Sequence, residues 1–177
     1  MTTTGTVLGV LATAGNESLQ RPRLRRRDVA LGLGIAAGLY AVFRVGDRIA
    51  RRVLPDGAEN IRNIYELREL RPKSEIALRL ATVIGPGEEL FWRGLVQRSI
   101  SQRRGNARGA IIATGLYGGA HLITGNMALI GAATVAGAYW SALAAAGVPM
   151  GALVVSHVIW DVWIFLVAPT YNAGGEH

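Results

Sequence analysis

Six charged or imidazole side chains interrupt apolar stretches of this 177-residue chain. They are Glu88, Glu89, Arg93, His121, His157 and Asp161. Such side chains are costly in hydrocarbon, and those that persist in membrane segments usually face the bundle interior or a water-filled cavity. Because the six lie on three separate apolar segments, the sequence predicts an active site assembled inside a membrane.

Two adjacent glutamates and an arginine form the first group. Glu89 and Arg93 are four residues apart, so on a helix they lie on one face in the order that favours an ion pair. Glu88 points about 100° away around the helix and cannot share Arg93 equally. We therefore predict that Glu89 and Arg93 neutralise and orient each other, whereas Glu88 is free to act as a base or a ligand. The alternative is an ordinary salt bridge at the cytoplasmic end of a helix.

The other two groups repeat the four-residue spacing. Tyr117 precedes His121, and His157 precedes Asp161, each by about one helical turn. An imidazole with a carboxylate one turn away is typical of an oriented metal ligand or an oriented general acid or base. A single histidine in an apolar segment is more often an interior residue with an ordinary hydrogen bond. However, these two are the only histidines besides His177, and both lie in apolar segments, which favours a shared function.

The residue types allow two mechanisms, and the sequence leaves both open. Glu88, His121 and His157 would give a catalytic divalent ion such as Zn²⁺ three protein ligands and an open position. Without a metal, a Glu–His pair would deprotonate water and a His–Asp pair would stabilise an oxyanion. The chain has no cysteine, which excludes thiolate catalysis and thiolate zinc sites. It also lacks the H-E-x-x-H, G-x-S-x-G and P-loop motifs.

Long apolar helices must position these residues. Half of the chain is apolar and only 18% is charged, whereas soluble proteins average about 25% charged residues. Since a span needs roughly 20 residues, we expect an all-α, polytopic membrane helix bundle with about five membrane segments around a polar intramembrane cavity. The expected segments are 29–43, 74–100, 109–124, 127–147 and 149–168.

The expected division of the chain is a flexible basic N-terminal tail, a single membrane-embedded domain and a C-terminal tail, over residues 1–28, 29–168 and 169–177. Residues 46–75 carry charges of both signs at helical spacing, which predicts a surface helix with ion pairs and a turn at residues 55–57. Gly85-Pro86-Gly87 is expected to interrupt or kink the helix directly before Glu88. The four tryptophans are interpreted as packing or interfacial anchors.

The net charge of +7 comes from basic runs beside apolar segments. Nucleic-acid-binding proteins place basic patches on soluble faces, whereas membrane proteins carry Lys and Arg in short cytoplasmic loops. The densest runs, 21–27 and 98–108, abut apolar segments, so we interpret both as cytoplasmic. This pattern predicts a multi-pass protein of the cell membrane that contacts the lipid bilayer and binds no nucleic acid.

The three motifs resemble those of the CPBP intramembrane proteases, which comprise type II CAAX prenyl endopeptidases, bacteriocin-processing enzymes and Abi proteins. The family pattern is E-E-x-x-x-R, then F-x-x-x-H, then H-x-x-x-N or D. Here it reads Glu88-Glu89-x-x-x-Arg93, Tyr117-x-x-x-His121 and His157-x-x-x-Asp161, and the resemblance covers roughly residues 75–168. It implies an all-α membrane bundle with a cavity that opens toward the cytosol.

The resemblance also implies a role for each motif residue. Glu88 and His121 would activate water, and the residues at His157 and Asp161 would stabilise the oxyanion or help to hold a metal. Tyr117 replaces the commoner Phe, a conservative change that we expect to be harmless. Asp161 stands where some members have Asn. Because an ionised Asp cannot donate a hydrogen bond to an oxyanion, a role in orienting His157 is favoured.

The expected function is an intramembrane endopeptidase that hydrolyses a peptide bond in a membrane-associated or exported peptide. Its partners would be a peptide or membrane-protein substrate and the lipid bilayer. Glu89, Arg93 and Tyr117 are expected to support the site structurally. Two alternatives stay open. One is a non-catalytic membrane immunity or scaffold protein of the same fold, and the other is a small metal or ion transporter, which would also place His and Glu at mid-membrane.

Overall fold

The computed structural model describes residues 24–53 and 57–168, and in this part of the chain every regular element is helical. The α-helices are α2 (Arg26–Val53), α3 (Gly57–Glu66), α4 (Lys73–Arg79), α5 (Gly85–Glu89), α6 (Arg98–Arg104), α7 (Asn106–Ala120), α8 (Met127–Ala145) and α9 (Met150–Val162). Short 3₁₀ turns cover Leu67–Leu70 and Leu122–Thr124, and π-helical turns cover Leu80–Ile84, Leu90–Gln97 and Trp163–Val167. The all-α prediction is confirmed. The expectations for residues 1–23 of the N-terminal tail, for the C-terminal tail and for most of the turn at 55–57 lie outside the described residues. α2 begins at Arg26, inside the segment 1–28 that was expected to be a flexible tail.

The helix that carries Glu88 and Glu89 runs without a break from Lys73 to Arg104, because π-helical turns join α4, α5 and α6. Pro86 lacks an N–H, and its ring clashes with the carbonyl four residues earlier in a regular α-helix. The π-helical turn just before it widens the helix, and the N–H of Gly85 bonds to the carbonyl of Leu80. The chain stays helical through Gly85-Pro86-Gly87, so the predicted break is wrong, and the alternative of a kink stays a prediction. The glutamates lie between two π-helical turns, a feature that is frequent at functional sites.

Among the described residues, three helices are long and apolar enough to cross a membrane: Arg26–Val53, Met127–Ala145 and Met150–Val167. The first of these, α2, also exposes large apolar side chains such as Leu33 and Ile49, which suits a surface that faces lipid. α7 has 15 residues, fewer than the roughly 20 that a perpendicular span requires. The membrane bundle is confirmed, and the count of about five spans stays a prediction.

The charged segment expected over residues 46–75 divides between two structural elements. Its first residues complete α2, where Arg51 and Asp47 form an ion pair at 3.1 Å, four residues apart. Its later part contains α3 and the start of α4, where Glu75 pairs with Arg71 at 2.9 Å and with Arg79 at 2.6 Å. The predicted ion pairs are therefore present, although α2 is longer than the expected segment 29–43.

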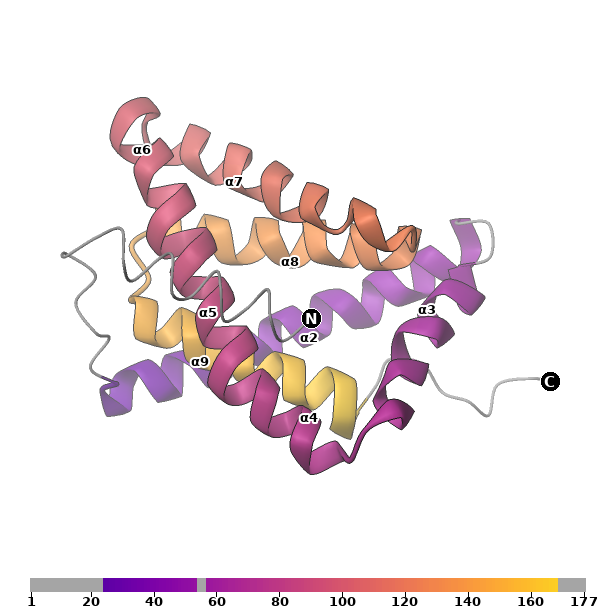
Figure 1. Cartoon of the computed structure of the whole chain (residues 1–177). Coiled ribbons are helices and arrows are strands. Elements are labelled where there is room, and N and C mark those ends of the chain that lie inside the picture. The colour runs from indigo at the N-terminus through magenta and orange to yellow at the C-terminus, as the bar shows by residue number, and fades with distance from the viewer. Residues whose placement is uncertain (1–23, 54–56, 169–177) are drawn as a thin grey trace.

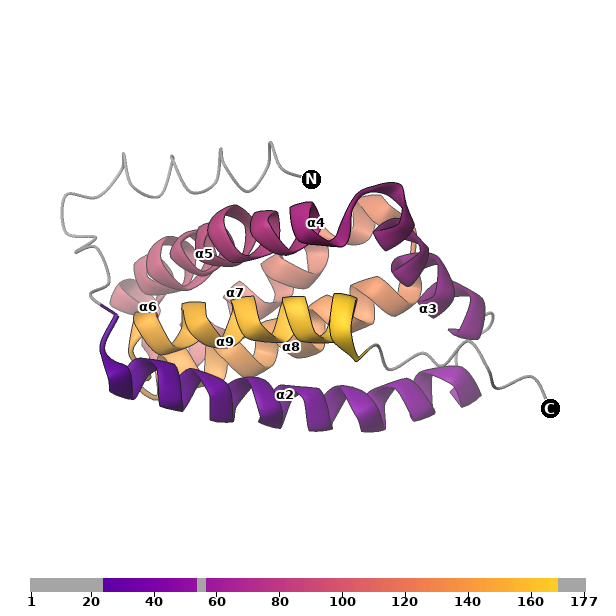
Figure 2. The same cartoon turned by 90° about the horizontal axis from the view of Figure 1, so that it is seen from below.

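The helices pack side by side in a flattened bundle (Figures 1 and 2). α2 lies along α9, and α7 lies along α8. The core between α2, α8 and α9 centres on Leu39, Trp140 and Leu153. In both views the start of α2 and the turn from α6 to α7 lie at the same end of the bundle. The described residues of the two basic runs therefore share one end, as their predicted common location in the cytoplasm requires.

Two glycines let α7 and α8 approach closely. A Cβ on Gly118 would lie 2.2 Å from the Thr134 hydroxyl oxygen, and a Cβ on Gly137 would lie 2.8 Å from Cδ1 of Tyr117. Small residues at such contacts are typical of packed membrane helices. The contact at Gly137 matters most for function, because it places the ring of Tyr117 against the backbone of α8.

Candidate active site

Glu89 is the centre of a buried polar cluster that joins two distant helices. Its Oε1 accepts one hydrogen bond from Nη1 of Arg93 at 2.9 Å and another from Nδ1 of His157 at 2.8 Å. Glu89 has no exposed surface, and Arg93 is 3% exposed. The predicted pair of Glu89 and Arg93 is therefore present, and the alternative of an ordinary salt bridge at a helix end is wrong.

The same helix face is tied to α8 by two further hydrogen bonds. Nη2 of Arg93 donates to the carbonyl of Gly137 at 3.1 Å, and Nε2 of Gln97 donates to the carbonyl of Ser141 at 2.8 Å. Glu89, Arg93 and Gln97 follow one another at four-residue intervals, as do their two acceptors on α8. The two helices are thus held in a fixed register, which in turn fixes the position of the glutamates along α8.

The His157 imidazole lies among three carboxylates. A carboxylate ion only accepts, so the contact with Glu89 means that Nδ1 of His157 carries a proton. Its Nε2 lies 3.4 Å from Oδ2 of Asp161 and 4.0 Å from Oε2 of Glu88. The contact with Asp161 follows the spacing noted in the sequence, whereas the shorter contact with Glu89 does not.

Trp140 supports His157 from the other side. The two rings are stacked with centroids 4.0 Å apart and an angle of 15° between their planes. Trp140 is fully buried, and its Nε1 donates to the hydroxyl of Ser156 at 3.0 Å. Nothing in the sequence separates Trp140 from the other three tryptophans, because its contact with His157 links residues on two helices.

Glu88 differs from its neighbour in exposure and in partners. Its side chain is 20% exposed, and its Oε2 accepts a hydrogen bond from the hydroxyl of Tyr117 at 2.7 Å. In the described part of the chain it makes no ion pair with Arg93. Glu88 is therefore the accessible carboxylate and Glu89 the buried one, which is the division expected from their positions on the helix.

His121 ends α7 beside this group. Its Nδ1 lies 2.9 Å from the carbonyl of Tyr117, and its ring lies edge-on to the Tyr117 ring at 5.1 Å. Because a carbonyl only accepts, Nδ1 is the donor and Nε2 is left as an acceptor. Among the described residues no hydrogen bond joins His121 to Glu88 directly. Tyr117 is the residue that links them.

A metal site would require several of these donors to converge on one point. Within the described ranges, no three His, Cys, Asp or Glu side chains are arranged so that they could hold a metal ion. The set of Glu88, His121 and His157 as metal ligands stays a prediction.

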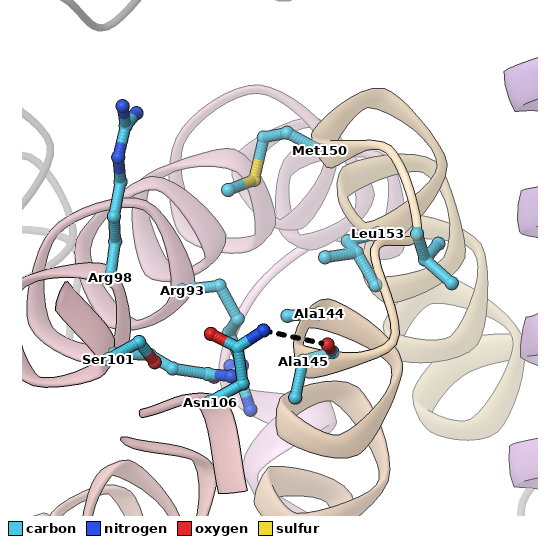
Figure 3. Close-up of a pocket in the computed structure, with 10 residues that line it drawn as sticks. Arg93, Arg98, Ser101, Asn106, Ala144, Ala145, Met150 and Leu153 are labelled. Atoms are coloured by element: carbon cyan, nitrogen blue, oxygen red, sulfur yellow. Dashed lines mark hydrogen bonds between the residues drawn. The ribbon is translucent and has the colours of Figure 1, made fainter. Parts of the chain in front are cut away.

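A pocket of about 210 Å³ shares Arg93 with the cluster and is lined in part by residues of α6 and the start of α7 (Figure 3). Its lining residues are Arg93, Gln97, Arg98, Ser101, Asn106, Ala144, Ala145, Val148, Met150 and Leu153. Among the lining residues, Nδ2 of Asn106 donates to the carbonyl of Ala145 at 3.4 Å. Of the described residues predicted to be catalytic, none lines this pocket.

Comparison with known families agrees with the geometry. A sequence model described as type II CAAX prenyl endopeptidase Rce1-like matches residues 74–163, and this range contains all three motifs. The chain belongs to this family. Its members are membrane proteases, so the resemblance noted in the sequence is confirmed at the level of family and general activity. No curated protein and no solved structure matches the chain.

Proposed function

We propose that this type II CAAX family member is an intramembrane endopeptidase that hydrolyses a peptide bond of a membrane-associated or exported peptide with water activated by Glu88. One observation carries the proposal. Glu88 is a partly exposed carboxylate that accepts a hydrogen bond from Tyr117 and lies 4.0 Å from Nε2 of a buried histidine, His157. A base and a prospective hydrogen-bond donor to an oxyanion thus lie side by side.

In the first step Glu88 takes a proton from water. The water oxygen forms a bond to the carbonyl carbon, and the carbonyl electron pair moves to oxygen to give a tetrahedral oxyanion. His121 supports this step, because its Nδ1 is occupied by the Tyr117 carbonyl and its Nε2 can accept a hydrogen bond from the same water. The scissile bond is still intact at this stage.

In the second step the oxyanion collapses. An N–H at Nε2 of His157 stabilises the oxyanion while it exists, and the negative charge of Asp161 favours that proton. The carbon–nitrogen bond then breaks, and Glu88 returns its proton to the leaving amine. The products are a new carboxyl terminus and a free amino terminus, and the enzyme regains its starting protonation.

Cleavage of a fluorogenic peptide library by detergent-purified protein tests the proposal. We expect Glu88→Gln to lower kcat/KM by about 10²- to 10⁴-fold, because the amide cannot take a proton. Glu75→Gln is the matched control, since Glu75 lies on the same continuous helix and its ion pairs with Arg71 and Arg79 are partly exposed to solvent. It should cleave like the wild type.

Equal cleavage by Glu88→Gln and the wild type would contradict the assignment. An inactive wild type that still binds a membrane partner would support the alternative of a non-catalytic immunity or scaffold protein. Metal uptake by cells that express the protein would support a transporter, because the protease hypothesis predicts no metal uptake.

A further inference from the structure

The ring of Tyr117 is held rigidly. It is 5% exposed, and the edge of Trp92 packs against it with ring centroids 5.4 Å apart. The Arg93 guanidinium lies over the ring, 4.9 Å from its centroid, a favourable cation–π contact. On the side of α8, Gly137 leaves no room for a side chain between the backbone and the ring. A ring clamped by helices on both sides cannot easily change rotamer.

This fixed residue contacts both groups that the proposed mechanism assigns to water activation. Its hydroxyl donates to Oε2 of Glu88 at 2.7 Å, and its carbonyl accepts from Nδ1 of His121 at 2.9 Å. The carbonyl would be available with any residue at this position. The hydroxyl would not, because the Phe that is commoner at this position has the same ring and no donor.

We propose that Tyr117 is a positioning residue that fixes the orientation of Glu88 through its hydroxyl, which makes the exchange of Phe for Tyr functional in this chain. The inference rests on the proposed function. Glu88 is partly exposed and lacks the arginine that restrains Glu89. Its other described contact, with His157, is 4.0 Å long, so the phenol is its close hydrogen-bond partner among the described residues.

Kinetics of Tyr117→Phe test the proposal. This variant keeps the ring and its packing, so we expect it to fold, with kcat lowered about 10- to 100-fold because a misplaced base loses its aligned attack geometry. KM should stay within about twofold of the wild type, because the hydroxyl contacts Glu88 and not the substrate. Tyr139→Phe is the control: it removes a hydroxyl that donates to the carbonyl of Ile35, on the side of α8 that faces α2. It should retain the wild-type kcat.

A stability cycle provides a readout that does not depend on activity. Tyr117→Phe should lower the melting temperature by about 2–4 °C in the wild-type background. It should have no such effect in a Glu88→Ala background, where the acceptor is already gone. Equal shifts in both backgrounds would show that the hydroxyl acts elsewhere and would overturn the proposal.

The kinetic outcomes distinguish a failure of the Tyr117 positioning role from a failure of the protease assignment. If the wild type is active, Glu88→Gln is inactive and Tyr117→Phe keeps full kcat, the role of Tyr117 is overturned and the protease assignment stands. If Glu88→Gln is as active as the wild type, the assignment itself falls, and with it the positioning role.

Discussion

His157 donates a hydrogen bond from Nδ1 to Oε1 of Glu89 at 2.8 Å, although the two residues lie 68 positions apart in the chain. The bond joins α9 to α5 in the interior of the bundle. It leaves Nε2 of the same imidazole directed toward Asp161 and Glu88. Glu89 therefore does more than neutralise Arg93, because it also sets which histidine nitrogen faces the accessible carboxylate.

Glu89→Ala should destabilise the fold by about 3–5 kcal/mol, because it would leave Arg93 buried without a counter-charge. Chemical unfolding in detergent measures the loss. Glu75→Ala is the control, since its ion pairs with Arg71 and Arg79 are partly exposed and its loss should cost less than about 1 kcal/mol. Equal costs for the two variants would mean that the Glu89 pair contributes no more than a surface pair.

Trp140 should be sensitive to truncation. Trp140→Ala removes a fully buried ring and its stack on His157, which should cost about 3–5 kcal/mol. Trp140→Phe retains an aromatic ring and should cost less, since it loses the hydrogen bond to Ser156 but leaves a smaller cavity than Ala does. Thermal unfolding ranks the two variants, and Trp163→Ala, at a site that is 48% exposed, should be milder than either. A reversed ranking would contradict the packing described for α8.

Gly137→Ala should destabilise the protein by about 1–3 kcal/mol, because the new methyl group would clash with the Tyr117 ring. Neither that ring nor the backbone of α8 has room to move away. Gly131 lies on the same helix with nothing within 4 Å of an added Cβ. Gly131→Ala should therefore be neutral or stabilising, by up to about 1 kcal/mol from helix propensity. The difference in unfolding free energy between the two variants measures how tightly α7 and α8 pack at Gly137. Identical values would contradict this close packing.

Asp161→Asn should lower kcat about tenfold with little change in stability, because the amide retains the shape of the carboxylate but not the charge that stabilises a proton on Nε2 of His157. Steady-state kinetics on the substrate that the wild type cleaves best provides the test. Wild-type kcat in Asp161→Asn would show that the carboxylate charge is not required and that a hydrogen-bonding side chain suffices.

Treatment with a strong chelator should leave activity unchanged, because no three donors among the described residues are arranged to hold a metal ion. The rate is measured before chelation, after chelation and after return of Zn²⁺. Loss of activity that Zn²⁺ restores would instead support Glu88, His121 and His157 as ligands.

The sequence predicted the features that depend on neighbours along one helix. The pairs of Glu89 with Arg93 and of His157 with Asp161 both follow from a spacing of four residues, and both form. The difference in exposure between Glu88 and Glu89 follows from the angle between adjacent positions. Pro86 is the exception, since a π-helical turn accommodates a residue that propensity alone would place at a break.

Contacts between helices could not be predicted in the same way. The bond from His157 to Glu89, the stack of His157 on Trp140 and the bond from Tyr117 to Glu88 each join residues on separate helices. They depend on the register between those helices. Close contacts at small residues and hydrogen bonds to α8 carbonyls determine that register. The sequence by itself determined which residue types were available and which of them share a helix face. Only the tertiary structure decided which histidine nitrogen faces Glu88 and which hydroxyl donates a hydrogen bond to Glu88. The helical repeat fixes the angles between residues of one helix, but it does not fix the distance between two helices.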